Sequence, residues 1–171
     1  ARFPAGTRVD RLRVGGETVE FVEVSMGNPH AVVRHPDPAS VVGVLGPVIE
    51  ADGRFPARTN VEFVREDGPG ELTMEVWERG VGRTLACGTG ACAVGAAAVH
   101  VGGTAGPVLV HLPGGDLVIE VDDDMRVTMT GTAEPVFRGE LGEALREALT
   151  SGGGAGARGA GPAPDRRVVP A

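Results

Sequence analysis

Alternating apolar and polar positions recur along most of the chain, and turns rich in Gly and Pro separate the runs. Alternation over about four to eight residues is typical of half-buried strands. The pattern predicts eight strands, and a weaker alternation suggests a ninth near the end. The predicted ranges are 8–14, 17–25, 30–34, 60–66, 71–78, 107–112, 116–121 and 125–130, with the weaker one at 133–137.

Helical patterns are predicted at 39–50, 89–101 and 140–149. From Gly90 to Val101 nearly every residue is Ala, Val, Gly or Cys. A helix that is apolar all round must be buried all round, and this run is too short to span a bilayer. The sequence therefore predicts an α+β fold, with a curled mixed β-sheet wrapped around this central hydrophobic helix.

The composition changes at the end of the chain. Residues 151–171 are rich in Gly, Ala and Pro and bury too little apolar surface to offset the entropy of ordering. We predict that they are disordered and that residues 1–150 form the folded domain. Because the chain starts at Ala1 and enters a strand pattern almost at once, we expect a protein that lacks its N-terminal part.

Charge and cysteine content exclude several functions. The net charge of −7, the pI near 5.1 and the low aromatic content argue against binding to nucleic acids or anionic membranes. Two cysteines five positions apart match no zinc or disulfide framework, so we expect no metal. Without a signal peptide or a long apolar span, we predict a cytoplasmic protein.

Cys87 stands at the entrance to the apolar helix, within a glycine-rich segment. Unsatisfied N–H groups and the positive end of the helix dipole favour anions there. They are expected to lower the pKa of the thiol from its reference of about 8.5. The same N–H groups, from Gly88 to Gly90, are suited to holding a carboxylate.

Glu78 precedes this segment at the end of a strand pattern. Period-2 alternation places it on the face of Leu72, Met74 and Val76, where a carboxylate needs a partner or a proton. Beside a thiol it is a candidate for acid/base chemistry. Alternatively Glu78 pairs with an arginine and Cys87 is a small core residue. These residues alone leave both interpretations open.

Two more polar clusters lie at strand ends, where binding groups are common. One is Met26-Gly27-Asn28-Pro29-His30, and the other is Arg58-Thr59-Asn60. Singly they indicate little, because Asn is frequent in turns and a lone His is commonly structural.

Taken in order, the motifs are Met-Gly-Asn-Pro-His, Arg-Thr-Asn-Val, Trp-Glu-Arg-Gly, Ala-Cys-Gly-Thr-Gly-Ala-Cys, Leu-Pro-Gly-Gly and Met-Thr-Gly. From about Val22 to Thr130 the chain closely resembles the C-terminal portion of the diaminopimelate epimerase family. Proline racemases and phenazine-biosynthesis isomerases share that family's general fold but not this series. The resemblance implies two similar halves, each a curled sheet around a central helix, with the site between them.

The resemblance also implies a cofactor-independent isomerase that interconverts LL- and meso-diaminopimelate for lysine and peptidoglycan synthesis. One cysteine acts on each face of the substrate's α-carbon, and Cys87 looks like one of the pair. Cys92 is predicted to pack in the core, because five residues along a helix point it away from Cys87. The resemblance also implies that Glu78 and Arg79 contact the substrate and that Glu78 assists proton transfer. It assigns the α-carboxylate to Gly88 and Thr89 and the distal end of the substrate to Asn28 and Asn60. His30 is implied to support the partner cysteine.

The half that would carry the second cysteine has no counterpart here. We expect that half as a partner, residues 131–150 to return toward it, and possible pairing into a homodimer. Arg83 and Thr132 depart from the family's usual acidic residue and proline, and Arg83 is close enough to Cys87 in sequence to alter local charge. Two alternatives remain: a non-catalytic binding or assembly module, and another racemase of this fold. The pair Asn28 and Asn60 argues against the racemase, because a smaller substrate needs no distal ligands.

Overall fold

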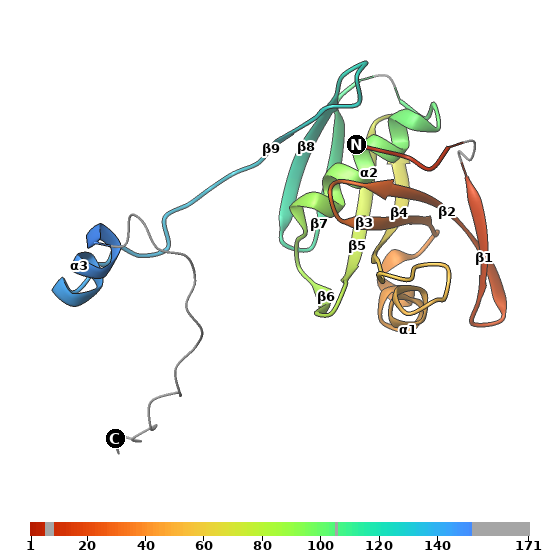
Figure 1. Cartoon of the computed structure of the whole chain (residues 1–171). Helices are drawn as coiled ribbons and strands as arrows, with labels where there is room; N and C mark the ends of the chain where they lie inside the picture. The colour runs from red at the N-terminus through yellow and green to blue at the C-terminus, as the bar shows by residue number, and fades with distance from the viewer. Residues whose placement is uncertain (6–8, 105, 152–171) are drawn as a thin grey trace. The chain divides into compact units, whose positions relative to one another are not determined.

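The computed structural model describes residues 1–5, 9–104 and 106–151. The chain divides into two compact units, residues 1–133 and residues 134–171. Figure 1 labels the elements of both. The first unit contains β1 (Asp10–Val14), β2 (Glu17–Ser25), β3 (Pro29–Arg34), α1 (Pro38–Glu50), β4 (Asn60–Gly68), β5 (Glu71–Glu78), β6 (Gly82–Thr84), α2 (Gly88–His100), β7 (Val108–Leu112), β8 (Gly115–Val121) and β9 (Val127–Thr130).

The strands of the first unit form one mixed sheet in the order β1-β2-β3-β4-β5-β7-β8-β9, with β6 paired to β5. The pairs β3–β4 and β5–β7 are parallel, and the other pairs are antiparallel. Each parallel pair is joined by a connection that contains a helix, α1 for the first and α2 for the second.

The sheet curls around α2, so the predicted α+β fold with a central hydrophobic helix is confirmed (Figure 1). Residues Gly90, Ala91 and 93–97 of the helix are buried. They pack in one cluster with side chains from six strands. These strand residues are Val22, Val24, Val32, Val64, Met74, Val76, Val108, Val110, Leu112 and Ile119.

Helix α1 covers the opposite face of β1–β5 and has a second core cluster of its own. Alternate residues supply it, such as Phe21 beside Val22 and Phe63 beside Val64. The helix begins at Pro38 after Asp37, whose carboxylate accepts a hydrogen bond from the Ser40 N–H. The central strands are therefore buried on both faces, which positions the polar residues at their ends.

Three predictions about elements need correction. Residues 133–137 form no strand; they are exposed, and Pro135 has no N–H to donate to a neighbouring strand. The short strand β6 was not predicted, because three residues give no readable alternation. Helix α3 of the second unit runs Glu143–Ser151, so Ser151 is helical rather than disordered. Residues 152–171, and residue 8 of the first predicted strand, lie outside the described residues.

None of the helices in the described part of the chain is both long enough and apolar enough to cross a membrane. The same residues contain no cluster of three or more His, Cys, Asp or Glu side chains that could hold a metal ion.

Candidate active site

Cys87 is the N-cap of α2. Its backbone is extended (φ −143°, ψ 106°), and Sγ accepts a hydrogen bond of 3.4 Å from the Gly90 N–H. Sγ also lies 3.6 Å from Oγ1 of Thr89. The N–H groups of Gly88 and Thr89 belong to the first turn, which has no acceptors within its own helix. A thiol and free backbone donors therefore meet at one helix entrance, as the sequence predicts.

The predicted direction of the Cys87 pKa is wrong. Burial raises the pKa of the thiol, and the nearby carboxylates of Glu78 and Glu62 raise it further. Hydrogen bonds from Thr89 and the Gly90 N–H lower it, but they do not outweigh burial. Cys87 is only 8% exposed, so loss of water around the sulfur decides the result. At neutral pH the residue is a thiol, suited to donating a proton.

Glu78 ends β5 on the side of Met74 and Val76, which pack against α2. Its carboxylate is half-buried and accepts a hydrogen bond of 2.5 Å from Oγ1 of Thr84 in β6. Within the described residues it has no arginine partner, so the alternative in which it forms an arginine ion pair does not apply there. Thr84 instead fixes a carboxylate close enough to Cys87 to influence its pKa.

His30 is completely buried at the start of β3, between two partners. Nδ1 is 2.7 Å from Oε1 of Glu62, and Nε2 is 3.1 Å from Oδ1 of Asn28. Glu62 is also completely buried. Sequence reasoning missed it, because a single Glu within a strand looks like a solvent-facing residue. Burial raises the pKa of Glu62, while the hydrogen bond from His30 lowers it.

Asn60 connects three segments of the site. Its Nδ2 donates to the Pro29 carbonyl, and its Oδ1 accepts from the Arg79 N–H, both at 2.9 Å. Arg79 also donates from Nη1 to the Ala57 carbonyl. One Nδ2–H of Asn60 has no partner within the described residues and is free for a ligand.

The turn after Glu78 is held by a buried carboxylate from α1. Glu50 accepts hydrogen bonds of 2.8 Å from Trp77 Nε1 and from the Gly80 N–H, and it pairs with Arg58. These bonds lower the pKa of Glu50 although burial acts in the opposite direction. Glu50 therefore stays charged and fixes the turn that carries Arg79.

Strand register brings the predicted site residues to one edge of the sheet. His30 pairs with Asn60 across parallel β3 and β4, and Val61 pairs with Trp77 across β4 and β5. The start of β3, the start of β4 and the end of β5 therefore coincide. Glu62 links this edge to α2, because a Cβ on Gly90 would lie 2.9 Å from its Oε1 and 3.2 Å from Sγ of Cys87.

Similarity to known proteins identifies the family of this chain. The family model for diaminopimelate epimerase matches residues 22–136. The chain belongs to the diaminopimelate epimerase family.

Relatives named diaminopimelate epimerase are known from several bacteria. The chain is 56% identical to the protein of Desulfitobacterium hafniense over 141 residues, which cover 82% of this chain and 49% of the relative. It is 53% identical over 142 residues to the protein of Desulforudis audaxviator, covering 81% and 51%. The chain thus spans about half the length of the family members that it matches. The crystal structure of a methylitaconate-delta-isomerase shares the fold, with a TM-score of 0.51, 16% identity, and coverage of 74% of this chain and 46% of that chain.

Arg83, which was expected to alter the charge near Cys87, pairs with the carboxylate of Glu75 instead. It forms two hydrogen bonds with Glu75, of 2.8 and 3.0 Å, in a fork-shaped ion pair. Glu75 and Glu78 differ by an odd number of positions in β5 and point to opposite faces. The charge of Arg83 is therefore neutralised away from the thiol. Thr132 is exposed and lies in no helix or strand.

Cys92 is a free, half-buried cysteine that packs against the α2 core cluster. The sequence prediction placed it inside the core, but it lies at the core's margin and is more exposed than Cys87. Burial raises the pKa of both thiols, and Cys87 is the less exposed of the two. Cys92 is separate from the site at the entrance of α2, because it lies in the second turn of that helix.

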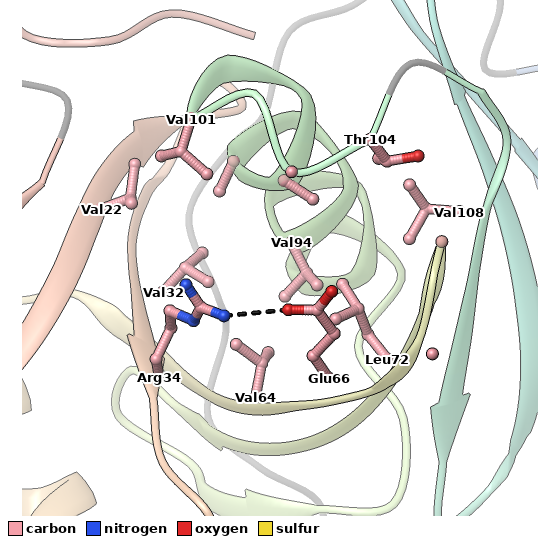
Figure 2. A pocket seen from close by; sticks show the side chains of 15 residues that line it. Val22, Val32, Arg34, Val64, Glu66, Leu72, Val94, Val101, Thr104 and Val108 are labelled. Atoms are coloured by element: carbon pink, nitrogen blue, oxygen red, sulfur yellow. Dashed lines mark hydrogen bonds and ion pairs between the residues drawn. The ribbon is translucent and has the colours of Figure 1, made fainter.

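A cavity of about 80 Å³ lies at the other end of α2. Figure 2 shows it between Val94, Val101 and the strands, with the Arg34–Glu66 ion pair beside it. Val101 is 13 positions beyond Gly88, about 20 Å along a helix. This apolar cavity is therefore distinct from the site around Cys87.

The pKa of Cys87 gives a prediction about thiol reactivity. Alkylation by iodoacetamide requires the thiolate, so the Cys87 rate should still be rising at pH 9. Glu78→Gln removes a negative charge that raises this pKa, so the thiolate fraction at pH 8 increases and alkylation becomes several-fold faster. Cys92 serves as the internal control, because burial, Cys87 and the N-terminal amine shift its pKa, not Glu78. An unchanged or slower Cys87 rate, measured by mass spectrometry, would contradict this assignment.

Proposed function

We propose that this chain supplies one half of a cytoplasmic diaminopimelate epimerase, which interconverts LL- and meso-diaminopimelate without a cofactor in lysine and peptidoglycan synthesis. The observation that carries the proposal is Cys87 at the entrance of a buried helix, at the edge where Asn28, Asn60 and Arg79 gather. The family membership and the names of the relatives support it.

The chemistry requires removal of a proton from a carbon that bears a carboxylate. Negative charge then develops on that carboxylate, and we assign its binding to the N–H groups of Gly88 and Thr89 and to the helix dipole. Cys87, a thiol at neutral pH, donates a proton to one face of the carbon. In the reverse direction the resulting thiolate removes it, and Glu78, held by Thr84, favours return of the proton to sulfur.

The distal end of the substrate is assigned to Asn28, Asn60 and Arg79. Asn60 retains an N–H, and Arg79 is exposed at the end of β5. Together they offer donors and positive charge, which suit a carboxylate. A module that binds diaminopimelate without turnover is the remaining alternative, because an inversion needs an acid and a base on opposite faces.

The opposed cysteine is assigned to a second half. Cys92 is remote from the helix entrance, and the chain spans about half of its relatives. Val81 and Leu85, on the approach to Cys87, are 73% and 69% exposed. Large apolar side chains exposed beside a site favour a covering partner.

The test combines this chain with the part of the Desulfitobacterium hafniense protein that it does not match; we call the mixture the complemented enzyme. We expect no turnover of LL-diaminopimelate by this chain alone. The complemented enzyme is expected to form meso-diaminopimelate, measured by chiral chromatography. Binding of both proteins and of substrate without turnover would support the binding module, and turnover by the isolated chain would contradict the need for a second half.

A further inference from the structure

Glu50 is a buried carboxylate at the end of α1, with 6% of its surface exposed. A buried carboxylate needs hydrogen-bond donors for both of its oxygens. Oε2 accepts from Nε1 of Trp77 at 2.8 Å. Oε1 accepts from the Gly80 N–H at 2.8 Å and from Nη1 of Arg58 at 3.2 Å. The carboxylate therefore joins the end of β5, the turn after it and the loop between α1 and β4.

Close packing of α1 on β5 sets the position of this carboxylate. A Cβ on Gly46 would lie 2.7 Å from Cβ of Trp77, so the helix approaches the strand this closely only because position 46 has no side chain. Glu50 follows four positions later, about one helical turn, and lies on the same face of the helix as Gly46. The glycine contact thus directs Glu50 toward the turn after β5.

Arg79 is attached to the protein next to two of these hydrogen bonds. Gly80, the residue that follows Arg79 in the turn, donates to Glu50. Nη1 of Arg79 donates to the Ala57 carbonyl at 3.0 Å, and Arg58, the residue after Ala57, also donates to Glu50. Arg58 has a φ of 55°, which is unfavourable for a residue with a side chain, so this loop depends on such bonds to keep its shape.

We propose that Glu50 is a positioning residue for Arg79: by holding the backbone beside Arg79 and beside Ala57, it fixes the direction of the guanidinium. The inference rests on the proposed function in taking Arg79 as a contact for the distal carboxylate of the substrate. Glu78 has a hydrogen bond of its own from Thr84, so its carboxylate stays in place without Glu50. Glu50 therefore acts on substrate binding more than on proton transfer.

Glu50→Gln separates this role from packing. Glutamine fills the same space, but its NH₂ group cannot accept a hydrogen bond, so either Trp77 or Gly80 loses its acceptor. Glu66→Gln is the matched control, because it removes a carboxylate that also pairs with an arginine, at an exposed position of β4. Arg79→Met and the double variant show whether Glu50 acts through Arg79.

The first measurement is hydrogen exchange by NMR on the full 171-residue chain, and it does not depend on activity. In Glu50→Gln the N–H groups of Arg79 and Gly80 should exchange about tenfold faster than in wild type, while those of β2 keep their rates. Glu66→Gln should leave both sets within about twofold of wild type. Unchanged exchange at Arg79 and Gly80 would overturn the proposal. An equal acceleration in β2 would also overturn it, because that would show a general loss of stability.

The second measurement is the kinetics of the complemented enzyme. Glu50→Gln should raise KM for LL-diaminopimelate about tenfold, with kcat changed by less than about threefold, whereas Glu66→Gln should stay within about twofold in both. Arg79→Met should raise KM at least as much. Adding Glu50→Gln to Arg79→Met should then change KM by no more than about twofold, since the residue that Glu50 positions is already gone.

A fall in kcat with unchanged KM in Glu50→Gln, or fully additive effects of the two substitutions, would contradict a role through Arg79. Absence of turnover in every protein would count against the proposed function. The exchange rates alone would then decide the role of Glu50.

Discussion

Replacing Cys87 by Ser is expected to lower the rate of epimerisation by the complemented enzyme by about 10²- to 10⁴-fold, the usual contribution of a positioned acid or base. A hydroxyl is a much weaker acid than a thiol, so it neither donates nor accepts the α-proton at a useful rate. The fold should survive, because Ser is a preferred N-cap and can accept the Gly90 N–H that Sγ accepts now.

Cys92→Ala is the control for this substitution. Cys92 lies on the same helix and is half-buried, but it is not at the helix entrance. Activity should therefore remain within about twofold of wild type, since substitutions away from a site have small effects. Circular dichroism would confirm that both variants fold. Full activity of a folded Cys87→Ser protein would remove the basis for its catalytic role.

Gly95→Ala is expected to lower the free energy of unfolding by about 1–3 kcal/mol, the usual cost of overpacking a core. A Cβ at Gly95 would overlap Cγ2 of Ile119 and lie 2.8 Å from its Cβ. Ile119 is fully buried in β8, and its Cβ and Cγ2 are too close to the backbone to move aside as the end of a flexible side chain could. The central helix can approach the sheet this closely only because position 95 has no side chain.

The matched control is Gly43→Ala in α1. Gly43 is exposed, and a Cβ there would meet nothing within 4 Å. Only the higher helix propensity of Ala then affects stability, so the free energy of unfolding should rise by about 0.5–1 kcal/mol. Urea denaturation of both variants measures the two effects. A Gly95→Ala chain as stable as wild type would contradict the close packing of α2 on β8.

The central architecture could be predicted from sequence because its signal is strong and local. The run from Gly90 to Val101 has almost no polar residue, so only a surrounding sheet can bury it. The strands around it alternate clearly, and each predicted site residue lies at a strand end or the helix entrance. Register across β3, β4 and β5 then brings most of these residues to one edge.

The parts that escaped prediction depend on tertiary surroundings. Glu62 alternates like a solvent-facing residue, and only the packing of α2 against β4 shows that it is buried beside His30. The helix dipole at Cys87 is visible in the sequence, but the burial that reverses its pKa shift is not. Arg83 similarly looked close to Cys87 along the chain, whereas strand alternation directs its partner Glu75 to the other face.

The central claim is that Cys87 exchanges a proton with the substrate's α-carbon without a cofactor. The most direct test is the deuterium content of that carbon after turnover of LL-diaminopimelate by the complemented enzyme in D₂O, with no cofactor added. One group accepts the proton removed from the α-carbon, a different group delivers a proton to the opposite face, and both groups exchange their protons with solvent. We therefore expect every inverted α-carbon to carry solvent deuterium, and Cys87→Ser to slow its formation by about 10²- to 10⁴-fold. Inverted product that retains its original hydrogen, or inversion that requires an added cofactor, would contradict it.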